Sequence, residues 1–210
     1  MRGLYRPDTP TTVTKLHLAS SSPRRREILD SLGLVYSWAA TDIGESPLAG
    51  ESAEAMVLRL AAAKVRAASV REVTAILGAD TAVVCGDRVL GKPASVDEAM
   101  EMLRSLSGQV HRVLTGVAVL AAGDTQTALS DTRVRFREIG QSEIVAYCRS
   151  GEFEGKAGAY AIQGLAGMFV ESLHGSYSGV VGLPVFETAA LLRAVGLDIF
   201  SMTTFSGSEK

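Results

Sequence analysis

The chain has 210 residues, of which 47% are hydrophobic and 21% charged, so it can bury a core without disulfides or metals. Its 21 basic and 23 acidic residues give a net charge of -2, which disfavours nucleic acids and anionic membranes as partners. Cys85 and Cys148 form no C-x-x-C motif, which favours a reducing compartment. Residues 1–14 lack the apolar segment of a signal peptide, and no run reaches transmembrane length, so we expect a cytoplasmic protein.

The first half of the chain predicts strands that alternate with helices. Strands are predicted at 15–20 and 34–40, and at 73–85 with a short return strand at 88–91. Between them, residues 22–33 predict a helix with Ser22 as N-cap, Pro23 at the first position and Gly33 as the stop. Apolar residues at helical spacing predict a second helix over 53–68.

The second half begins with the best-defined helix, 95–108, where Ser95 and Glu98 form a capping box. Residues 111–139 predict a long antiparallel hairpin that turns near Gly123 and Asp124. A short helix at 142–151, a strand at 168–175 and a helix at 184–196 complete the pattern. The fold class is therefore α/β, with a mixed twisted sheet flanked by helices and two lobes around a cleft.

The chain shows no repeats and no low-complexity linker, so we expect a single domain. We place that domain at residues 15–200, after a disordered leading segment at 1–14 and before a flexible tail at 201–210.

The stretch "GDRVLGKP", residues 86–93, matches most of a phosphate-binding loop of the Walker A type. A true phosphate loop connects a strand to a helix, whereas these residues are predicted to form a hairpin, and Pro93 replaces the magnesium-binding hydroxyl. We interpret the match as accidental, and predict that Lys92 is held beside Asp80.

Asp80 is a candidate site residue because a carboxylate inside the apolar run "ILGADTAVV" is costly unless it is paired or binds a cation. The alternatives are a structural cap or an ion pair with Lys92. Three lysines, Lys64, Lys92 and Lys156, lie among small and apolar residues, which suits either a phosphate contact or an ordinary packed stem.

The start of the first helix is a candidate anion site. Arg24, Arg25 and Arg26 crowd the helix end where the dipole disfavours cations, and the hydroxyls of Ser20, Ser21 and Ser22 precede them. These groups could converge on a polyphosphate. The alternative is a solvated basic face, and Arg26 at least is expected to point away.

A polyphosphate calls for a divalent cation. His17, His111 and His174 are scattered, so carboxylates are the expected ligands. Asp80 with Glu45 would give the oxygen-only, partly hydrated site that magnesium or manganese prefers. Glu45 lies in a loop flanked by Gly and Pro, where an acidic residue is often merely solvated.

Six motifs together resemble the Maf family of nucleoside triphosphate pyrophosphatases, whose fold is similar to that of the inosine triphosphatase group. They are "LASSSPRRREIL", "ILGADTAVV", "LGKP", "MLRSLSGQVHRVLTGVAV", "GKAGAYAIQG" and "GSYSGVVGLPVFET", in family order over residues 15–197. The "YAIQG" stretch is similar to that of the subgroup acting on dTTP and UTP. Two departures are Ala161, where glycine is usual, and Gly44, where an acidic residue is common; the second weakens the metal role of Glu45.

The resemblance implies roles for particular residues. Asp80 would be the general base and would work with a divalent metal, and Glu45 occupies the matching acidic position. Arg24, Thr81 and Gln163 stand where the family selects its substrate, and the amide of Gln163 could read a pyrimidine edge. The phosphates would be held by Ser22, Arg24, Arg25, Lys64 and Lys92, with Ser20 beside them.

The implied reaction is hydrolysis between the α- and β-phosphates, with water as nucleophile. Whether Asp80 acts as base or as metal ligand stays open, as does a role for modified pyrimidine triphosphates as substrates. A homodimer is expected from the family only. Two other classes are considered: a nucleotide-sensing regulator of cell division without turnover, and a nucleic-acid binder, which the near-neutral charge disfavours.

Overall fold

A seven-stranded mixed sheet forms the centre of the computed structural model, which describes residues 15–70 and 73–202. The strand order is β2-β1-β3-β5-β6-β7, with β4 paired to the end of β3. β1 is parallel to β2 and β3, whereas β3, β5, β6 and β7 follow one another antiparallel. The strands are β1 (Leu16–Ala19), β2 (Tyr36–Ala39), β3 (Ala75–Cys85), β4 (Arg88–Leu90), β5 (Val110–Ala121), β6 (Asp124–Phe136) and β7 (Val170–His174). The predicted mixed sheet is confirmed.

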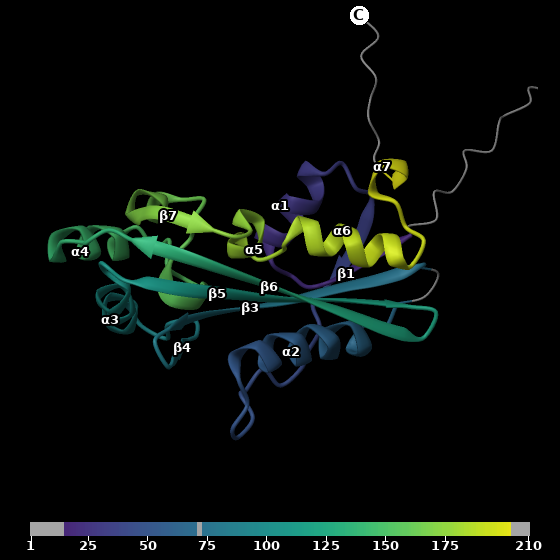
Figure 1. Cartoon of the computed structure of the whole chain (residues 1–210), viewed down its shortest axis with the longest axis horizontal. Coiled ribbons are helices and arrows are strands. Elements are labelled where there is room, and N and C mark those ends of the chain that lie inside the picture. Colours follow the sequence, from purple (N-terminus) through teal and green to yellow (C-terminus); the bar gives the residue numbers. More distant parts are fainter. Residues whose placement is uncertain (1–14, 71–72, 203–210) are drawn as a thin grey trace, which may run out of the picture.

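Helices cover both faces of this sheet (Figure 1). α2 packs on one face against β3 and β5, whereas α5 and α6 pack on the other against β5 and β6. The α-helices are α1 (Pro23–Ser31), α2 (Ala53–Ala67), α3 (Val96–Leu106), α4 (Gln141–Arg149), α5 (Tyr177–Val181), α6 (Val185–Ala194) and α7 (Ile199–Met202), and two 3-10 segments are η1 (Ala157–Ala159) and η2 (Leu165–Phe169).

All five predicted helices are present, and the additional ones are short. α5, α7, η1 and η2 have at most five residues, so none is long enough to show a helical repeat of apolar positions. The predicted leading segment, residues 1–14, and positions 203–210 of the predicted tail lie outside the described residues. Residues 201–202 belong to α7.

Two details of the predicted helix starts are corrected. Ser22 occupies the N-cap position of α1, but its side chain makes no capping hydrogen bond. Ser95 accepts from the Glu98 amide at 3.1 Å, as expected, whereas the Glu98 carboxylate accepts from the amide of Ala94 rather than that of Ser95. In both cases the backbone path just before the helix decides which amide a side chain can reach.

Both predicted hairpins form. β3 and β4 pair antiparallel around a turn in which Gly86 has a φ of +57°, so residues 86–93 are not a phosphate loop. β5 and β6 turn at Ala122 and Gly123, which both have positive φ as the tight hairpin turn requires. The turn lies one residue before its predicted place.

The buried residues form two main clusters on the shared sheet. One joins α3, α4 and the end of β6, with Phe136, Leu103 and Ile144 fully buried. The other joins β1, α1 and α6, with Leu18, Leu29 and Leu192 fully buried. Each cluster has its own helices, so the sheet carries two lobes, as the sequence predicts.

α2 lies unusually close to the sheet because two glycines face it. A Cβ at Gly78 would stand 2.9 Å from the carbonyl oxygen of Ala61, and a Cβ at Gly116 would overlap the backbone of Val57. Such contacts are shorter than real Cβ atoms tolerate. The glycines of "ILGADT" and "LTGVAV" therefore set the distance between α2 and strands β3 and β5, and with it the position of Lys64, which lines the site.

Candidate active site

A pocket of about 550 Å³ lies where the two lobes meet. Its walls come from the end of β1, the first turn of α1, α2, β3, the loop after β4 and residues 154–163. All ten predicted site residues line it, namely Ser20, Ser22, Arg24, Arg25, Glu45, Lys64, Asp80, Thr81, Lys92 and Gln163. The structure thus brings together residues that are up to 143 positions apart in the sequence.

Asp80 pairs with Lys64 rather than with Lys92. The Lys64 Nζ donates to Asp80 Oδ1 at 2.6 Å and contacts Glu45 Oε1 at 2.7 Å, whereas Lys92 Nζ is 3.5 Å from Glu45 Oε2. The Lys64 and Asp80 side chains are only 8% and 13% exposed, against 63% for Lys92. The prediction that Lys92 is held beside Asp80 is wrong. The buried partner of Asp80 is Lys64, which comes from the helix α2 packed on the face of β3 and β5.

Glu45 joins this group from the exposed loop 40–52. Burial alone would raise the pKa of the Glu45 carboxyl, but the hydrogen bond and charge of Lys64, with Lys92 beside it, hold it below its usual range. Glu45 is therefore ionised at neutral pH. Two carboxylates and one ammonium then share a single small volume.

The two carboxylates supply oxygen ligands only. Within residues 15–70 and 73–202, no three His, Cys, Asp or Glu side chains are grouped so as to hold a metal ion. Magnesium is commonly bound by one or two carboxylates plus substrate phosphates and water. Glu45 and Asp80 fit that incomplete type of site.

Arg25 is anchored by the protein on three sides. Its Nε donates to the carbonyl of Gly182 at 2.8 Å, and its two Nη atoms reach Ser20 Oγ at 3.1 Å and Thr81 Oγ1 at 3.4 Å. Thr81 Oγ1 in turn contacts the hydroxyl of Thr115 at 3.0 Å. Burial lowers the pKa of the Arg25 guanidinium, and the charge of Asp80 opposes that shift. This network holds α1 against β3 and α5.

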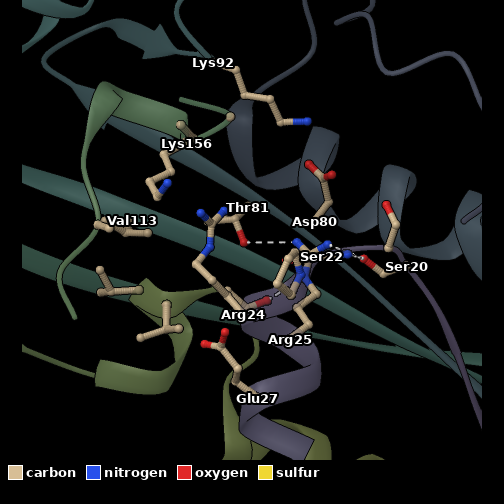
Figure 2. A pocket seen from close by; sticks show the side chains of 18 of the residues that line it. Ser20, Ser22, Arg24, Arg25, Glu27, Asp80, Thr81, Lys92, Val113 and Lys156 are labelled. Atoms are coloured by element: carbon tan, nitrogen blue, oxygen red, sulfur yellow. Dashed lines mark hydrogen bonds between the residues drawn. The ribbon is translucent and has the colours of Figure 1, made fainter. Parts of the chain in front are cut away.

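Arg24 and Lys156 point into the pocket with their charges available. Figure 2 shows Arg24 on the first turn of α1 and Lys156 on the opposite wall, with Lys92 above. In the described part of the chain, neither side chain forms an ion pair within 4 Å, although Lys156 donates to the carbonyl of Glu154 at 3.1 Å. Burial, followed by repulsion from Arg24, lowers the pKa of Lys156. The two cations can therefore receive an anion between them.

Lys156 is the main lining residue that was not assigned to the site from the sequence. The signal that points to it is its small and apolar surroundings, which it shares with Lys64 and Lys92. Arg26 does point away, as expected. Its guanidinium stacks over the ring of Trp38 at 4.1 Å from the centroid, outside this pocket.

Gln163 is exposed and lines the pocket, on a loop that hydrogen bonds hold on both sides of it in the chain. The Glu152 carboxylate accepts from the amides of Leu165 and Ala166 at 2.8 and 3.2 Å, just after Gln163 in the chain. Tyr160, which precedes it, is held at 2.8 Å by Nε2 of the buried His111. The amide of Gln163 is thus presented to the pocket from a well-supported loop.

Comparison with known proteins identifies the family. The family model described as Maf-like protein matches residues 15–195. The chain belongs to the Maf family. The proteins named dTTP/UTP pyrophosphatase from Hahella chejuensis and Cupriavidus metallidurans are each 50% identical, over 193 and 194 residues. They cover 89% and 87% of this chain, and 95% and 97% of their own lengths.

A solved structure of a nucleoside-triphosphatase, dITP/XTP pyrophosphatase, from Mycobacterium abscessus is more distant from this Maf chain. It superposes with a TM-score of 0.35 at 15% identity, over 60% of this chain and 76% of that one. The fold class follows from the strand order of the sheet. None of the helices in the described residues has the length and hydropathy needed to cross a membrane.

Proposed function

We propose that this Maf protein hydrolyses dTTP and UTP, and by the same chemistry modified pyrimidine triphosphates, to the monophosphate and pyrophosphate. The observation that carries the proposal is the pocket in which Arg24, Lys92 and Lys156 surround the Lys64–Asp80 pair. Cations arranged around a largely buried carboxylate suit a polyphosphate that is to be attacked by water. The names of relatives at about 50% identity support the same activity.

The polyphosphate is proposed to lie between the two walls of the pocket. Arg24 would contact it from α1, with the hydroxyls of Ser20 and Ser22 beside it, and Lys92 and Lys156 would contact it from the other lobe. Arg25, whose donors already reach Gly182, Ser20 and Thr81, would act mainly by holding this wall in place. Positive charge on both sides would neutralise the charge that builds on the leaving pyrophosphate.

Asp80 is proposed as the general base. Its Oδ1 is held by Lys64, whereas in the described residues its Oδ2 has no hydrogen-bond partner and can take a proton from a water molecule. A rigid carboxylate with one oxygen fixed and one free is well placed for that transfer. Lys64 holds Asp80 in a fixed orientation through this contact, so we assign it to positioning as well as to charge neutralisation.

A divalent cation, Mg²⁺ or Mn²⁺, fits the donor set only together with substrate. Glu45 and Asp80 provide hard oxygen ligands that already converge on one ammonium, and the triphosphate would supply further oxygens. When bound, such an ion polarises phosphoryl oxygens and lowers the pKa of water. The residues that would hold it are Glu45 and Asp80.

Substrate choice is proposed to depend on Gln163, Arg24 and Thr81. The exposed amide of Gln163 offers one donor group and one acceptor to a pyrimidine edge. Thr81 would act through Arg25, since its hydroxyl is bonded to that guanidinium and to Thr115.

The test is pyrophosphate release from a panel of nucleoside triphosphates with Mg²⁺ or Mn²⁺. We expect release from dTTP and UTP, a loss of 10²- to 10⁴-fold in Asp80→Asn, and a changed order of preference in Gln163→Glu. Asp131→Asn is the matched control, because Asp131 is a surface carboxylate paired with Arg112 outside the pocket. Full activity of Asp80→Asn would contradict the proposed base.

The competing function is a nucleotide sensor of cell division that binds without turnover. It predicts measurable dTTP or UTP binding, no pyrophosphate release from any substrate, and no effect of Asp80→Asn on its signalling role. A cytoplasmic location and a homodimer also stay predictions, and light scattering at several protein concentrations would test the second.

A further inference from the structure

Glu45 reaches the pocket from a loop that has little packing of its own. Residues 44–50 are all exposed, and the Glu45 side chain itself is 45% exposed. Ile43 packs partly against the cluster around Met56 and Val57, but after Ile43 the loop turns away from the core. Something other than burial must therefore fix the position of the Glu45 carboxylate.

One arginine of α2 bonds to the loop on the far side of Glu45 from Ile43. Arg59 forms a two-point ion pair with Glu51, with its Nε 2.5 Å from Oε1 and its Nη2 2.7 Å from Oε2. The same Nη2 donates to the carbonyl of Ser46 at 3.2 Å, one residue beyond Glu45. Glu51 also accepts from the amide of Leu48 at 3.0 Å, which closes the turn between them.

These contacts form a clamp, which we define as Arg59, Glu51 and the backbone of residues 46–48. A bidentate arginine–carboxylate pair fixes orientation as well as distance. The Glu51 side chain is only 8% exposed, so the pair is shielded on that side. Arg59 lies on the same helix as Lys64, the residue that Glu45 contacts at 2.7 Å. The clamp thus ties both ends of the Glu45–Lys64 contact to one rigid element.

We propose that Arg59 and Glu51 are positioning residues for the reaction, acting through Glu45. The inference rests on the function proposed above. In the intact clamp, the Glu45 carboxylate stays beside Asp80 and is ready to share a divalent cation with it. Without the clamp, the exposed loop 40–52 samples other conformations, and part of the binding energy of the cation goes into ordering it.

The main variant is Arg59→Met, which removes all three hydrogen bonds of the arginine but keeps an unbranched helical side chain. Loss of a residue that orients a metal ligand commonly costs about 10- to 100-fold in metal affinity or activity. We expect the Mn²⁺ concentration for half-maximal pyrophosphate release to rise by a factor in that range, with most of kcat recovered at saturating Mn²⁺. Arg59→Lys keeps the positive charge but cannot form the two-point ion pair, so its Mn²⁺ requirement should lie between those of the wild type and Arg59→Met.

Arg112→Met is the matched control. Arg112 also pairs with carboxylates, Glu54 in the first turn of α2 and Asp131 on β6, but in the described residues it forms no hydrogen bond or ion pair with loop 40–52, and it lies outside the pocket. Thermal unfolding of both variants shows whether either change has a general effect on stability. A selective effect of Arg59→Met on Mn²⁺ then separates positioning from folding.

A double-mutant cycle with Glu45→Gln decides whether Arg59 acts through Glu45. We expect Arg59→Met to have little further effect on the Mn²⁺ requirement once Glu45 is replaced. Additive effects in the cycle, or an unchanged Mn²⁺ requirement in Arg59→Met, would overturn the inference and leave the proposed function standing.

A second readout does not depend on turnover. Electron paramagnetic resonance of free Mn²⁺, in the presence of a non-hydrolysable α,β-methylene analogue of dTTP, measures the binding of the ion directly. We expect weaker Mn²⁺ binding in Arg59→Met than in Arg112→Met. If the wild type released no pyrophosphate from any nucleotide, the proposed function would fail, and equal Mn²⁺ binding by the two variants would overturn the clamp separately.

Discussion

Replacing Gly116 by alanine tests whether the close approach of α2 positions the site. The added Cβ would lie 2.6 Å from the carbonyl carbon of Val57 and 2.8 Å from the amide nitrogen of Leu58, and it would overlap the Val57 oxygen. These are backbone atoms of α2, which cannot move aside as a flexible side chain can. The helix must therefore shift away from β5 as a unit.

The expected cost follows from two opposing effects. Overpacking a core costs about 1–3 kcal/mol, whereas replacing a strand glycine by alanine returns roughly 0.5–1 kcal/mol. These two effects give a net loss of about 0–2.5 kcal/mol, and at roughly 2–4 °C per kcal/mol for a chain of this size the unfolding temperature should fall by up to about 10 °C. Because Lys64 moves with α2, its 2.6 Å contact with Asp80 should lengthen, and a misplacement of this kind can reduce kcat by about 10²-fold.

The assays are differential scanning calorimetry and pyrophosphate release from dTTP at saturating metal. Gly44→Ala is the control for stability, because Gly44 has no atom within 4 Å of its Cβ position and should unfold at the wild-type temperature or slightly above. A Gly116→Ala protein with unchanged unfolding temperature and unchanged kcat would refute the argument that the glycine sets the Lys64–Asp80 geometry.

Three further predictions concern charges. Burial lowers the pKa of His111 to about 4, so the unfolded chain binds more protons than the folded protein between about pH 4 and 6.5. The free energy of unfolding of the wild type should therefore fall by on the order of 3 kcal/mol as the pH drops through that range. Urea titrations of His111→Gln should lack this loss. The hydrogen bonds of Arg137, and then the amide of Gly140, lower the pKa of Glu143 to about 2, so its contribution to stability is complete above about pH 4.5 and is lost as the pH falls towards 2; urea midpoints in Arg137→Met should depend less on pH there. Lys156→Met should raise the KM for dTTP about tenfold or more, the effect of one charge-assisted hydrogen bond of roughly 1.5–3 kcal/mol, and steady-state kinetics would show it.

Local sequence signals predicted the elements because each signal acts within a few residues. The apolar spacing of Met56, Val57 and Leu60 defined α2, and the alternation of Val134 and Phe136 with arginines defined β6. The short elements carried no such signal. In "GSYSGVVG" the helix α5 is held by the Ser176 hydroxyl, which accepts from the Gly179 amide at 3.0 Å, and by the packing of Gly179 beneath Ser130, neither of which depends on periodicity.

The ten residues predicted from the sequence line one pocket, but the sequence did not predict how they pair or that Lys156 joins them. Asp80 was identified because a carboxylate in an apolar strand needs a partner, but the strand itself does not say which partner. Lys92 is closer to Asp80 along the chain, whereas Lys64 is the lysine that contacts Asp80 in the fold. Asp80 pairs with Lys64 because α2 approaches the sheet closely at Gly78 and Gly116. Sequence patterns describe each segment separately and do not predict this contact between segments.

The same reasoning explains why Arg59 and Glu51 were not identified as important from the sequence. Arg59 lies in the middle of α2 and Glu51 just before the helix, where charged residues are ordinary, and a pair whose arginine is still 31% exposed contributes modestly to stability. The Arg59–Glu51 pair matters because Arg59 also binds the carbonyl of Ser46, the residue next to Glu45. Glu45 in turn contacts the buried Lys64. An ion pair that contributes little to stability can therefore affect activity strongly when, like Arg59–Glu51, it positions a carboxylate that has little packing of its own, here Glu45. Substitutions in the clamp should accordingly change the metal requirement more than the unfolding temperature, whereas substitutions at Gly78 or Gly116 should change both.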